Sequence, residues 1–227
     1  MEIVNKRQWK INKILYYLFK ERFRKKIDFN FPEDLNRWDL INQIIYLKNF
    51  SSYLEIGCDD DHAFSKIKLE DKIGVDPSSG GNFRGTSDDF FQQNRRKFDC
   101  IFIDGLHEYD QVCKDILNSL DNLNVNGIIL LHDCLPKSMS QQAVPRHQWV
   151  WNGDVWKCIV KFRCRNDLDI VTCKIDQGIS IIRKTSNKNQ LDLKITNFKK
   201  LKFKDFYYNH KKYMRILEYD EVLEYIK

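Results

Sequence analysis

Acidic and imidazole side chains follow two apolar segments of this 227-residue chain, at the point where each segment ends. Residues 98–103 precede Asp104 and His107, and residues 127–131 precede a His-Asp pair at 132–133. Short apolar runs bounded by glycine and polar residues are typical of strands buried on both faces of a sheet. The chemistry of such sheets lies just past the carboxyl ends of the strands. Two carboxylates and two imidazoles at these ends therefore predict a reaction centre.

Two shorter apolar segments upstream predict a cofactor site. Residues 52–56 end at Gly57, and residues 72–75 end at Asp76, which lies 19 positions after Gly57. In nucleotide-binding βαβ units, an acidic residue about 20 positions beyond the glycine turn binds the ribose hydroxyls. The turn itself reads Cys-Asp-Asp-Asp-His at 58–62 and lacks the dinucleotide fingerprint. Its acidic charge suits a cationic ligand better than a pyrophosphate, so we expect a cofactor with a sulfonium and an ammonium group rather than NAD or ATP.

Taken together, these segments resemble class I S-adenosylmethionine-dependent methyltransferases from Tyr53 to about Arg183. Residues 55–57 (Glu-Ile-Gly) are similar to their first motif, and residues 74–77 (Gly-Val-Asp-Pro) to the acidic end of their second strand. Residues 86–91 resemble the third-strand loop that lies near adenine. The resemblance is closest to the branch of sugar O-methyltransferases of macrolide tailoring and cephalosporin-hydroxylase-like enzymes, and residues 151–157 also match that branch.

This resemblance implies an α/β fold of the Rossmann-like methyltransferase type, with a seven-stranded, mostly parallel sheet and helices on both faces. It implies an S-adenosylmethionine-dependent enzyme that transfers a methyl group to a hydroxyl of a sugar or glycan. The cofactor contacts that it implies are Glu55, Gly57, Asp76, Ser87, Asp88 and Asp104. For Asp88 the residues leave an alternative open, because Ser87-Asp88 could simply cap the following helix. For Glu55 the alternative is a carboxylate that only accepts backbone hydrogen bonds in the turn.

The same resemblance places a base and a metal site after the fourth and fifth strands. The positions that match are Asp104 and His107 for catalysis, and Asp104, His132 and Asp133 for a divalent metal, Mg²⁺ or Mn²⁺. Neighbouring strands lie about 5 Å apart, so two carboxylates at these ends repel unless a proton or cation lies between them. His132 would favour Mn²⁺ as a ligand. Alternatively, His132 points into the core.

His107 is the predicted proton acceptor. A histidine with an ordinary pKa of about 6.5 can take a proton from a sugar hydroxyl at neutral pH. The alternative is a solvated histidine at a helix start. Two departures from the family pattern stand out: Asp61 occupies the place of the last motif glycine, and His132 replaces the first acid of the pair.

The composition indicates a globular domain, with 42% hydrophobic and 31% charged residues. No apolar run approaches the ~20 residues of a membrane span, and the N-terminus lacks a signal-peptide pattern. The seven cysteines form no CxxC pair, which predicts reduced thiols and a cytoplasmic location. Residues 1–26 carry a net charge of +7 and residues 183–227 carry +6, around an acidic middle. Such ends suggest an acidic partner, although solvated helical faces are the simpler reading.

We expect three parts: an N-terminal helical extension (1–50), a methyltransferase domain (51–184) and a basic C-terminal extension packed on that domain (185–227). Apolar residues between Trp9 and Phe23 recur at helical spacing among lysines and arginines and predict a basic amphipathic helix. Such a helix could lie on a membrane surface, but more often packs on its own domain or on a dimer mate. Further helices are expected near 34–48, 62–69, 87–95, 108–123, 154–165 and 213–226, and the last strands at 168–174 and 178–183.

Two other classes of function are compatible with the residues: a methyltransferase that acts on nucleic acid or a small metabolite, and a cofactor-binding module without turnover. The basic ends would suit a nucleic-acid methyltransferase. However, residues 103–106 (Ile-Asp-Gly-Leu) are not the Asn/Asp-Pro-Pro-aromatic motif of amino-directed DNA methyltransferases, so nucleic acid is disfavoured as a substrate. The second alternative is a cofactor-binding module without turnover. The tryptophans at 149, 151 and 156 suit either a sugar platform or a core.

Overall fold

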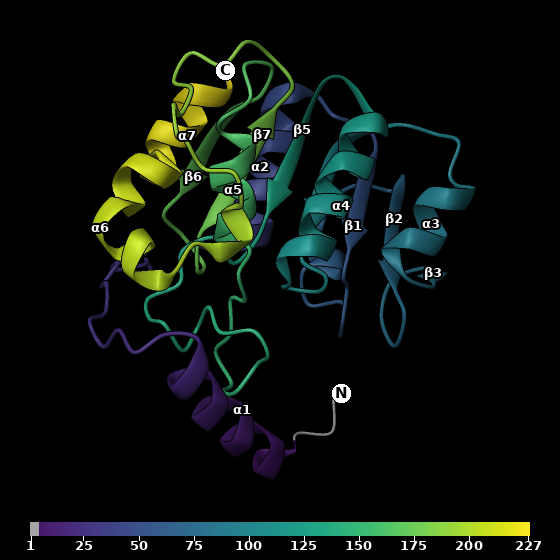
Figure 1. Ribbon diagram of the computed structural model, residues 1–227. Helices are drawn as coiled ribbons and strands as arrows, with labels where there is room; N and C mark the ends of the chain where they lie inside the picture. The colour runs from purple at the N-terminus through teal and green to yellow at the C-terminus, as the bar shows by residue number, and fades with distance from the viewer. Residues whose placement is uncertain (1–4) are drawn as a thin grey trace.

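The computed structural model describes residues 5–227, which form a single eight-stranded sheet covered by helices (Figure 1). The strands are β1 (Tyr53–Ile56), β2 (Lys72–Asp76), β3 (Phe83–Arg84), β4 (Phe98–Ile103), β5 (Leu123–Leu131), β6 (Asp169–Cys173), β7 (Ile179–Arg183) and β8 (Ile216–Leu217). The helices are α1 (Lys6–Phe19), α2 (Arg37–Lys48), α3 (Ser87–Gln93), α4 (Tyr109–Asp121), α5 (Trp156–Phe162), α6 (Phe203–Met214) and α7 (Tyr219–Ile226), with 3₁₀ turns at Phe64–Lys66 and Phe198–Lys200.

The strand order is β3-β2-β1-β4-β5-β7-β6-β8, and β7 is antiparallel to both of its neighbours. The order reverses between β1 and β4, which lie side by side although their sequences are about 45 residues apart. A switch point of this kind opens a crevice at the carboxyl ends of the strands. The predicted α/β class with a mostly parallel sheet is therefore confirmed, and the crevice falls where the acidic and imidazole side chains were predicted to meet.

The sheet has one strand more than the seven expected. Residues 216–217 form β8, which pairs in parallel with Thr172 and Cys173 of β6. The single helix predicted over 213–226 is wrong for this reason. Arg215 has a left-handed backbone conformation (φ +46°), which ends α6, and α7 begins only after β8. The pattern of apolar residues continues across this break and so concealed it.

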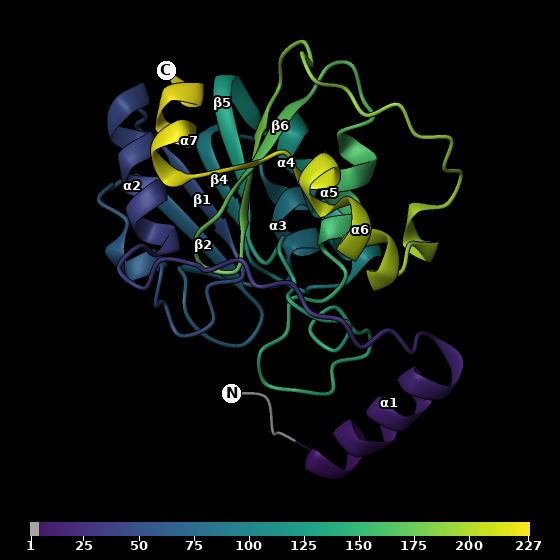
Figure 2. The same ribbon diagram turned by 90° about the vertical axis from the view of Figure 1, so that its left-hand side faces the viewer.

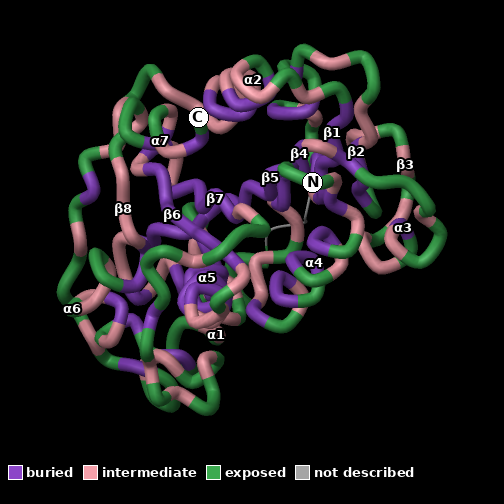
Figure 3. Tube along the Cα trace, turned by 90° about the horizontal axis from the view of Figure 1, so that it is seen from above, coloured by how far each residue is buried: buried purple, intermediate pink, exposed green. Residues whose placement is uncertain are grey.

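Helices cover both faces of the sheet. Figure 2 shows α2 and α7 on one side and α3, α4, α5 and α6 on the other. Alternate residues of β4 enter separate cores, because Ile101 and Ile103 face the α4–α5 layer whereas Cys100 and Phe102 face α2 and α7. This two-sided burial, visible as the central buried strands of Figure 3, explains the unbroken apolar runs in the sequence.

Two other expected helices differ from the structure. The segment 62–69 contains only the 3₁₀ turn Phe64–Lys66, because Asp59 and Asp61 have left-handed backbones (φ +46° and +62°) that turn the chain. The N-terminal helix ends at Phe19, so that Phe23 lies in an extended segment, where its ring packs on Tyr207. Within residues 5–227, none of the helices has the length and apolarity required to span a bilayer.

Candidate active site

A cavity of about 640 Å³ opens at the carboxyl ends of β1, β2 and β4. Five of the six predicted cofactor contacts line it: Gly57, Asp76, Ser87, Asp88 and Asp104. His107 and Trp151 form part of the same lining, as do Asp115 and Arg146. The parallel register of β1 with both β2 and β4 brings these side chains together, because it aligns the three strand ends.

Gly57 lets the turn after β1 pass against the end of β4. It has a left-handed backbone (φ +89°), and a Cβ built on it would lie 2.6 Å from the Cα of Gly105 and closer still to the carbonyl oxygen of Asp104. Any side chain here would therefore push the two strand ends apart. Asp61, which stands where the resemblance implies a glycine, has a left-handed backbone (φ +62°), and its carboxylate accepts a hydrogen bond of 2.6 Å from the backbone N–H of Gly81.

Asp76 at the end of β2 is a buried carboxylate held by backbone donors. Its Oδ1 accepts hydrogen bonds from the N–H groups of Ser78 and Ser79, and its Oδ2 accepts one from the N–H of Asp59. Burial by itself would raise the pKa of Asp76, but these hydrogen bonds outweigh it and lower the pKa below the ordinary value. Asp76 is thus ionised at neutral pH, and its Oδ2, with one hydrogen bond, retains capacity for a ligand hydroxyl.

Glu55, the remaining predicted cofactor contact, does not line the cavity. Its side chain is 1% exposed, and its carboxylate accepts a hydrogen bond of 2.5 Å from the hydroxyl of Tyr53. Burial raises the pKa of Glu55 to about 8, although the Tyr53 bond partly opposes this. The cofactor role of Glu55 stays a prediction.

Ser87 and Asp88 lie in the first turn of α3, on the cavity wall. The amide of Gln111 on α4 donates to the Ser87 hydroxyl at 3.1 Å and to Asp88 at 3.3 Å, and Lys114 forms an ion pair of 2.6 Å with Asp88. The side-chain cap of α3 is Thr86, whose hydroxyl accepts from the N–H of Asp89, so neither Ser87 nor Asp88 provides that cap. Both side chains are thus positioned by α4 at the cavity.

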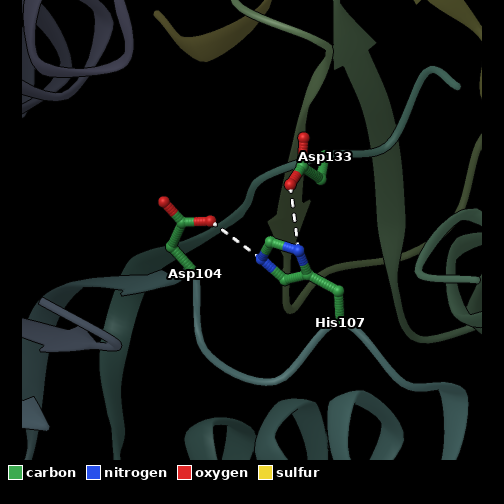
Figure 4. A group of neighbouring side chains, drawn as sticks. All are labelled: Asp104, His107 and Asp133. Atoms are coloured by element: carbon green, nitrogen blue, oxygen red, sulfur yellow. Dashed lines mark hydrogen bonds and ion pairs between the residues drawn. The ribbon is translucent and has the colours of Figure 1, made fainter. Parts of the chain in front are cut away.

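At the other end of the cavity, the ring of His107 lies between two carboxylates (Figure 4). Its Nε2 is 3.3 Å from Oδ1 of Asp104, and its Nδ1 is 3.1 Å from Oδ2 of Asp133. Burial would lower the pKa of His107, but the charge of Asp133 and the contact with Asp104 raise it above the ordinary 6.5. The predicted grouping of Asp104, His107 and Asp133 at two neighbouring strand ends is what the structure has.

The surroundings of Nδ1 indicate which nitrogen of a neutral His107 carries the proton. Besides Asp133, Nδ1 faces the carbonyl oxygen of Trp151 at 3.3 Å, and a carbonyl only accepts. In the free protein Nε2 also faces an acceptor, Asp104, so the two contacts favour the protonated ring, in agreement with the raised pKa of His107. When the ring is neutral, its proton is assigned to Nδ1, which faces two acceptors, and Nε2 keeps a lone pair. A proton acceptor at Nε2 would stand beside Asp104 on the cavity wall.

His132 lies beneath this pair and is almost fully buried. Its Nδ1 is 2.9 Å from Oδ1 of Asp104, and its Nε2 is 2.8 Å from the carbonyl oxygen of Asp176. Each ring nitrogen of His132 thus faces an oxygen that accepts a hydrogen bond, so both nitrogens carry a proton. Burial would lower the pKa of His132, but Asp104 and Asp133 raise it to about 10, so the ring is a cation at neutral pH.

Arg37, in the first turn of α2, was not singled out from the sequence. Its guanidinium donates to Oδ2 of Asp104 and, through Nε, to Asp176 at 2.8 Å. Burial would raise the pKa of Asp104, but the charge of His132, the hydrogen bonds of both histidines and Arg37 together hold it well below its usual range. A cation in the first turn of a helix opposes the helix dipole, and this unfavourable placement is the one sequence signal that could have drawn attention to Arg37.

The segment 151–154 closes over His107. The rings of Trp151 and His107 lie 5.4 Å apart, the backbone N–H of Asp154 donates to the carbonyl oxygen of His107 at 3.2 Å, and the amide of Asn152 donates to Asp133 at 2.9 Å. The other two tryptophans lie elsewhere: Trp156 is fully buried in the core, whereas Trp149 is 64% exposed and packs on Trp9 of α1.

For a metal ion, the described residues offer a different trio from the predicted Asp104, His132 and Asp133. Ligand atoms of Asp104, His107 and Asp133 lie within 4.8 Å of one another. His132 is not part of this group, and its two nitrogens lie 2.9 Å from Asp104 and 2.8 Å from the carbonyl oxygen of Asp176. A metal would therefore need His107 as its nitrogen ligand.

Comparison with known proteins agrees with this architecture. Residues 77–134 match a sequence family described as "Methyltransferase domain". A putative O-methyltransferase from Klebsiella pneumoniae has a TM-score of 0.54 at 12% identity, with 80% of this chain and 99% of that one covered. A putative caffeoyl-CoA O-methyltransferase from Staphylococcus aureus has a TM-score of 0.51 at 15% identity, covering 78% and 91%. No curated protein matches the sequence.

At these identities the solved structures establish the fold. The chain has the class I methyltransferase fold, and the matched segment runs from the residue after Asp76 through β4 to the residue after Asp133. The resemblance drawn from the sequence is thus confirmed for the fold and for the methyltransferase-domain segment.

Proposed function

We propose that this protein is an S-adenosylmethionine-dependent O-methyltransferase that acts on a hydroxyl of a sugar or glycan, with His107 as the proton acceptor. One observation carries the proposal: His107 lines the same cavity as Gly57 and Asp76, and its Nε2 lies 3.3 Å from Asp104, which also lines that cavity. A cofactor site and a positioned base thus share one space, as an in-line transfer to an oxygen requires.

The residues that line the cavity suit the charge and the hydroxyl groups of the cofactor. Asp76 retains acceptor capacity at Oδ2 for a ribose hydroxyl, and the exposed carboxylate of Asp59 also lines the cavity, which suits a sulfonium or an ammonium group. Gly57 lets the turn after β1 pass against the end of β4, and both Gly57 and Asp104 line the cavity at this crossing. When bound, the cofactor supplies an electrophilic methyl group.

The chain's own residues then handle one proton. The acceptor hydroxyl gives its proton to Nε2 of His107 as its oxygen forms the bond to the methyl carbon and the bond from that carbon to sulfur breaks. Asp133 holds Nδ1–H at 3.1 Å and stabilises the resulting imidazolium. The positive charge of the cofactor beside the ring favours the neutral form of His107 before transfer, against the raised pKa of the free protein.

Trp151 supports a sugar acceptor. Its ring lies beside His107 and lines the cavity, so that an apolar ring face borders the proton acceptor. Aromatic faces next to polar groups pack well on sugar rings, whose C–H groups cover one side. Trp149 and Trp156 play no part in this surface.

Metal assistance, which the family resemblance implies, would use Asp104, His107 and Asp133 as ligands and supply a Lewis acid for the acceptor oxygen. It would also remove His107 as a base. Since Arg37 and His132 already neutralise Asp104, the carboxylates of this site do not require a further cation. We therefore assign the role of proton acceptor to His107 and propose a methyl transfer that does not require a metal ion.

The test is mass spectrometry of a glycan panel incubated with the protein and isotopically labelled S-adenosylmethionine. The proposal expects labelled methyl groups on sugar hydroxyls, at least ~100-fold less with His107→Gln, and calorimetric binding of the cofactor by both proteins. Cofactor binding with no methylated product on any oxygen acceptor would identify a binding module instead.

A further inference from the structure

Helix α1 projects from the body of the protein on one side of the cavity. Figures 1 and 2 show it at the end of the molecule opposite the C-terminus, separate from the helices that cover the sheet. It contacts the body along one face only. The amide of Asn12 donates to the carbonyl oxygen of Arg146 at 3.0 Å, Tyr16 packs on His147, and Trp9 packs on Trp149.

The base of α1 is fixed to the core. Buried Glu21 accepts hydrogen bonds of 2.8 Å from the N–H groups of Phe203 and Lys204 at the start of α6, and Gln142 donates to both Glu21 and the Tyr16 hydroxyl. These bonds join the end of α1 to two distant parts of the chain. The helix therefore presents a defined face to its surroundings.

That outward face is apolar. Five large apolar side chains of α1 are 42–76% exposed, at positions i, i+3, i+4, i+7 and i+8: Ile11, Ile14, Leu15, Leu18 and Phe19. This spacing places them on one side of a helix, and the residues that contact the body, Trp9, Asn12 and Tyr16, lie on the other. A folded protein usually turns the apolar side of a surface helix toward its core, so here the orientation is inverted.

Cations surround this apolar face. Residues 5–26 contain nine lysines and arginines, all exposed, and their single acid is the buried Glu21. Arg7 and Lys10 lie on the turn before Ile11 and Ile14 of the same helix. An exposed apolar stripe bordered by cations fits the boundary between the acyl chains and the anionic headgroups of a bilayer.

We propose that α1 binds the surface of an anionic membrane, with the apolar side chains of Ile11, Ile14, Leu15, Leu18 and Phe19 in the acyl boundary and the lysines and arginines among the headgroups. A second copy of this chain is a poorer occupant. Pairing two such faces would bring cations together in either orientation. Arg7 and Lys10 of one copy would lie near those of the other in a parallel pair and near Lys20 and Arg22 in an antiparallel pair, and α1 carries no acidic residue to offset them. Anionic lipid satisfies both the apolar and the cationic groups.

Membrane binding by α1 would also orient the protein on the lipid surface. Arg146 and Trp151 line the cavity, and α1 contacts the segment that contains Arg146. Membrane binding by α1 would thus hold the mouth of the cavity near the lipid surface. The binding itself does not depend on the methyl-transfer proposal, because it uses none of the residues at His107.

Flotation of the full-length protein with vesicles tests the inference. We expect binding to vesicles of equal parts phosphatidylglycerol and phosphatidylcholine, little binding to phosphatidylcholine alone, and release at high salt. Leu15→Glu should weaken binding roughly tenfold or more, as expected from losing one buried leucine. Leu117→Glu is the matched control, because Leu117 on α4 is 44% exposed and Leu15 is 48% exposed. It should bind like the wild type, and both variants should retain the wild-type Tm.

Three results would overturn the proposal. The first is equal binding of wild type and Leu15→Glu to anionic vesicles. The second is no vesicle binding together with a dimer that Leu15→Glu dissociates, which would assign the face to a second copy. The third is no vesicle binding together with salt-sensitive binding of duplex DNA, which would assign the cations to nucleic acid. The double variant Arg7→Glu/Lys10→Glu checks the electrostatic part and should lose the preference for phosphatidylglycerol.

Discussion

Gly153 lies directly against the backbone of His107. It has a left-handed conformation (φ +60°), and a Cβ built on it would lie 2.6 Å from the Cβ of His107 and in severe overlap with the carbonyl oxygen of His107. The segment 151–154, more than 40 residues downstream, thus sets the position of the predicted base. This contact gives a physical role to a glycine that the sequence showed only as part of a family-like stretch.

Substitution of Gly153 should therefore impair catalysis without affecting the cofactor. Gly153→Ala forces His107 to move, and a displacement of about 1 Å at a reacting group can reduce kcat roughly 100-fold. The affinity for S-adenosylmethionine should stay within about twofold, because Gly153 does not line the cavity. Steady-state kinetics and calorimetry on the same sample separate the two effects. An equal loss in both would indicate a general structural defect.

Removal of the base should have a larger and pH-specific effect. His107→Ala should reduce kcat by about 10²–10⁴ and leave cofactor affinity nearly unchanged. Since Asp133 and Asp104 raise the pKa of His107, kcat/KM of the wild type should fall on the acid side with a midpoint above 6.5. The variant should lack this acid limb. The control is His62→Ala, since His62 does not line the cavity. Wild-type turnover by His107→Ala would show that another group accepts the proton.

Asp76 should matter for cofactor binding alone. Asp76→Ala removes a charged acceptor for the ribose hydroxyls and should weaken S-adenosylmethionine binding by roughly 1.5–3 kcal/mol. Asp76→Asn, which can still accept one set of the backbone hydrogen bonds, distinguishes loss of the ligand contact from collapse of the Ser78–Ser79 loop. Asp60→Ala is the control at an exposed acid of the neighbouring turn. Unchanged affinity by calorimetry would exclude Asp76 from the ribose site.

Removal of metal distinguishes the two possible roles of His107. With Arg37 and His132 neutralising Asp104, we expect methyl transfer to persist after dialysis against EDTA. Activity that is lost with EDTA and restored by Mn²⁺ or Mg²⁺ would instead make Asp104, His107 and Asp133 metal ligands.

The cluster around Arg37 should stabilise the fold in a pH-dependent manner. Arg37→Met leaves Asp104 and Asp176 without their guanidinium and should lower the free energy of unfolding by roughly 3–5 kcal/mol at pH 7, the usual loss for breaking a buried pair. The pKa values of both carboxyls lie below their ordinary range, so this stabilisation is present above pH ~4 and is lost as the pH falls further. The difference between the two proteins in urea denaturation should shrink accordingly.

A surface pair provides the control for that measurement. Arg96 forms an ion pair of 2.5 Å with Asp71, but the two side chains are 43% and 51% exposed. Arg96→Met should therefore cost no more than about 1 kcal/mol, with little dependence on pH. A similar loss in both variants would contradict the special role assigned to Arg37.

The sequence alone determined the strands and the polar residues at their ends. Buried strands have a strong local signature, since both faces must be apolar, and the residues after them are polar because the strand ends reach the crevice. For this reason Asp104, His107 and Asp133 could be predicted as neighbours. Gly57 and Asp76 could likewise be predicted to lie together at the ends of adjacent strands.

Only the tertiary structure decided how the charges of the site are arranged. Arg37 and Asp176 come from α2 and from the β6–β7 turn, and no local pattern links residues 139 positions apart. The same holds for His132, which became a buried cation through its contacts with Asp104 and Asp176. The outward orientation of α1 was equally undetermined, because an amphipathic pattern specifies which side is apolar but not what that side faces. Long-range contacts determine these features. Because the interactions that stabilise them join residues far apart in the sequence, no short segment predicts them.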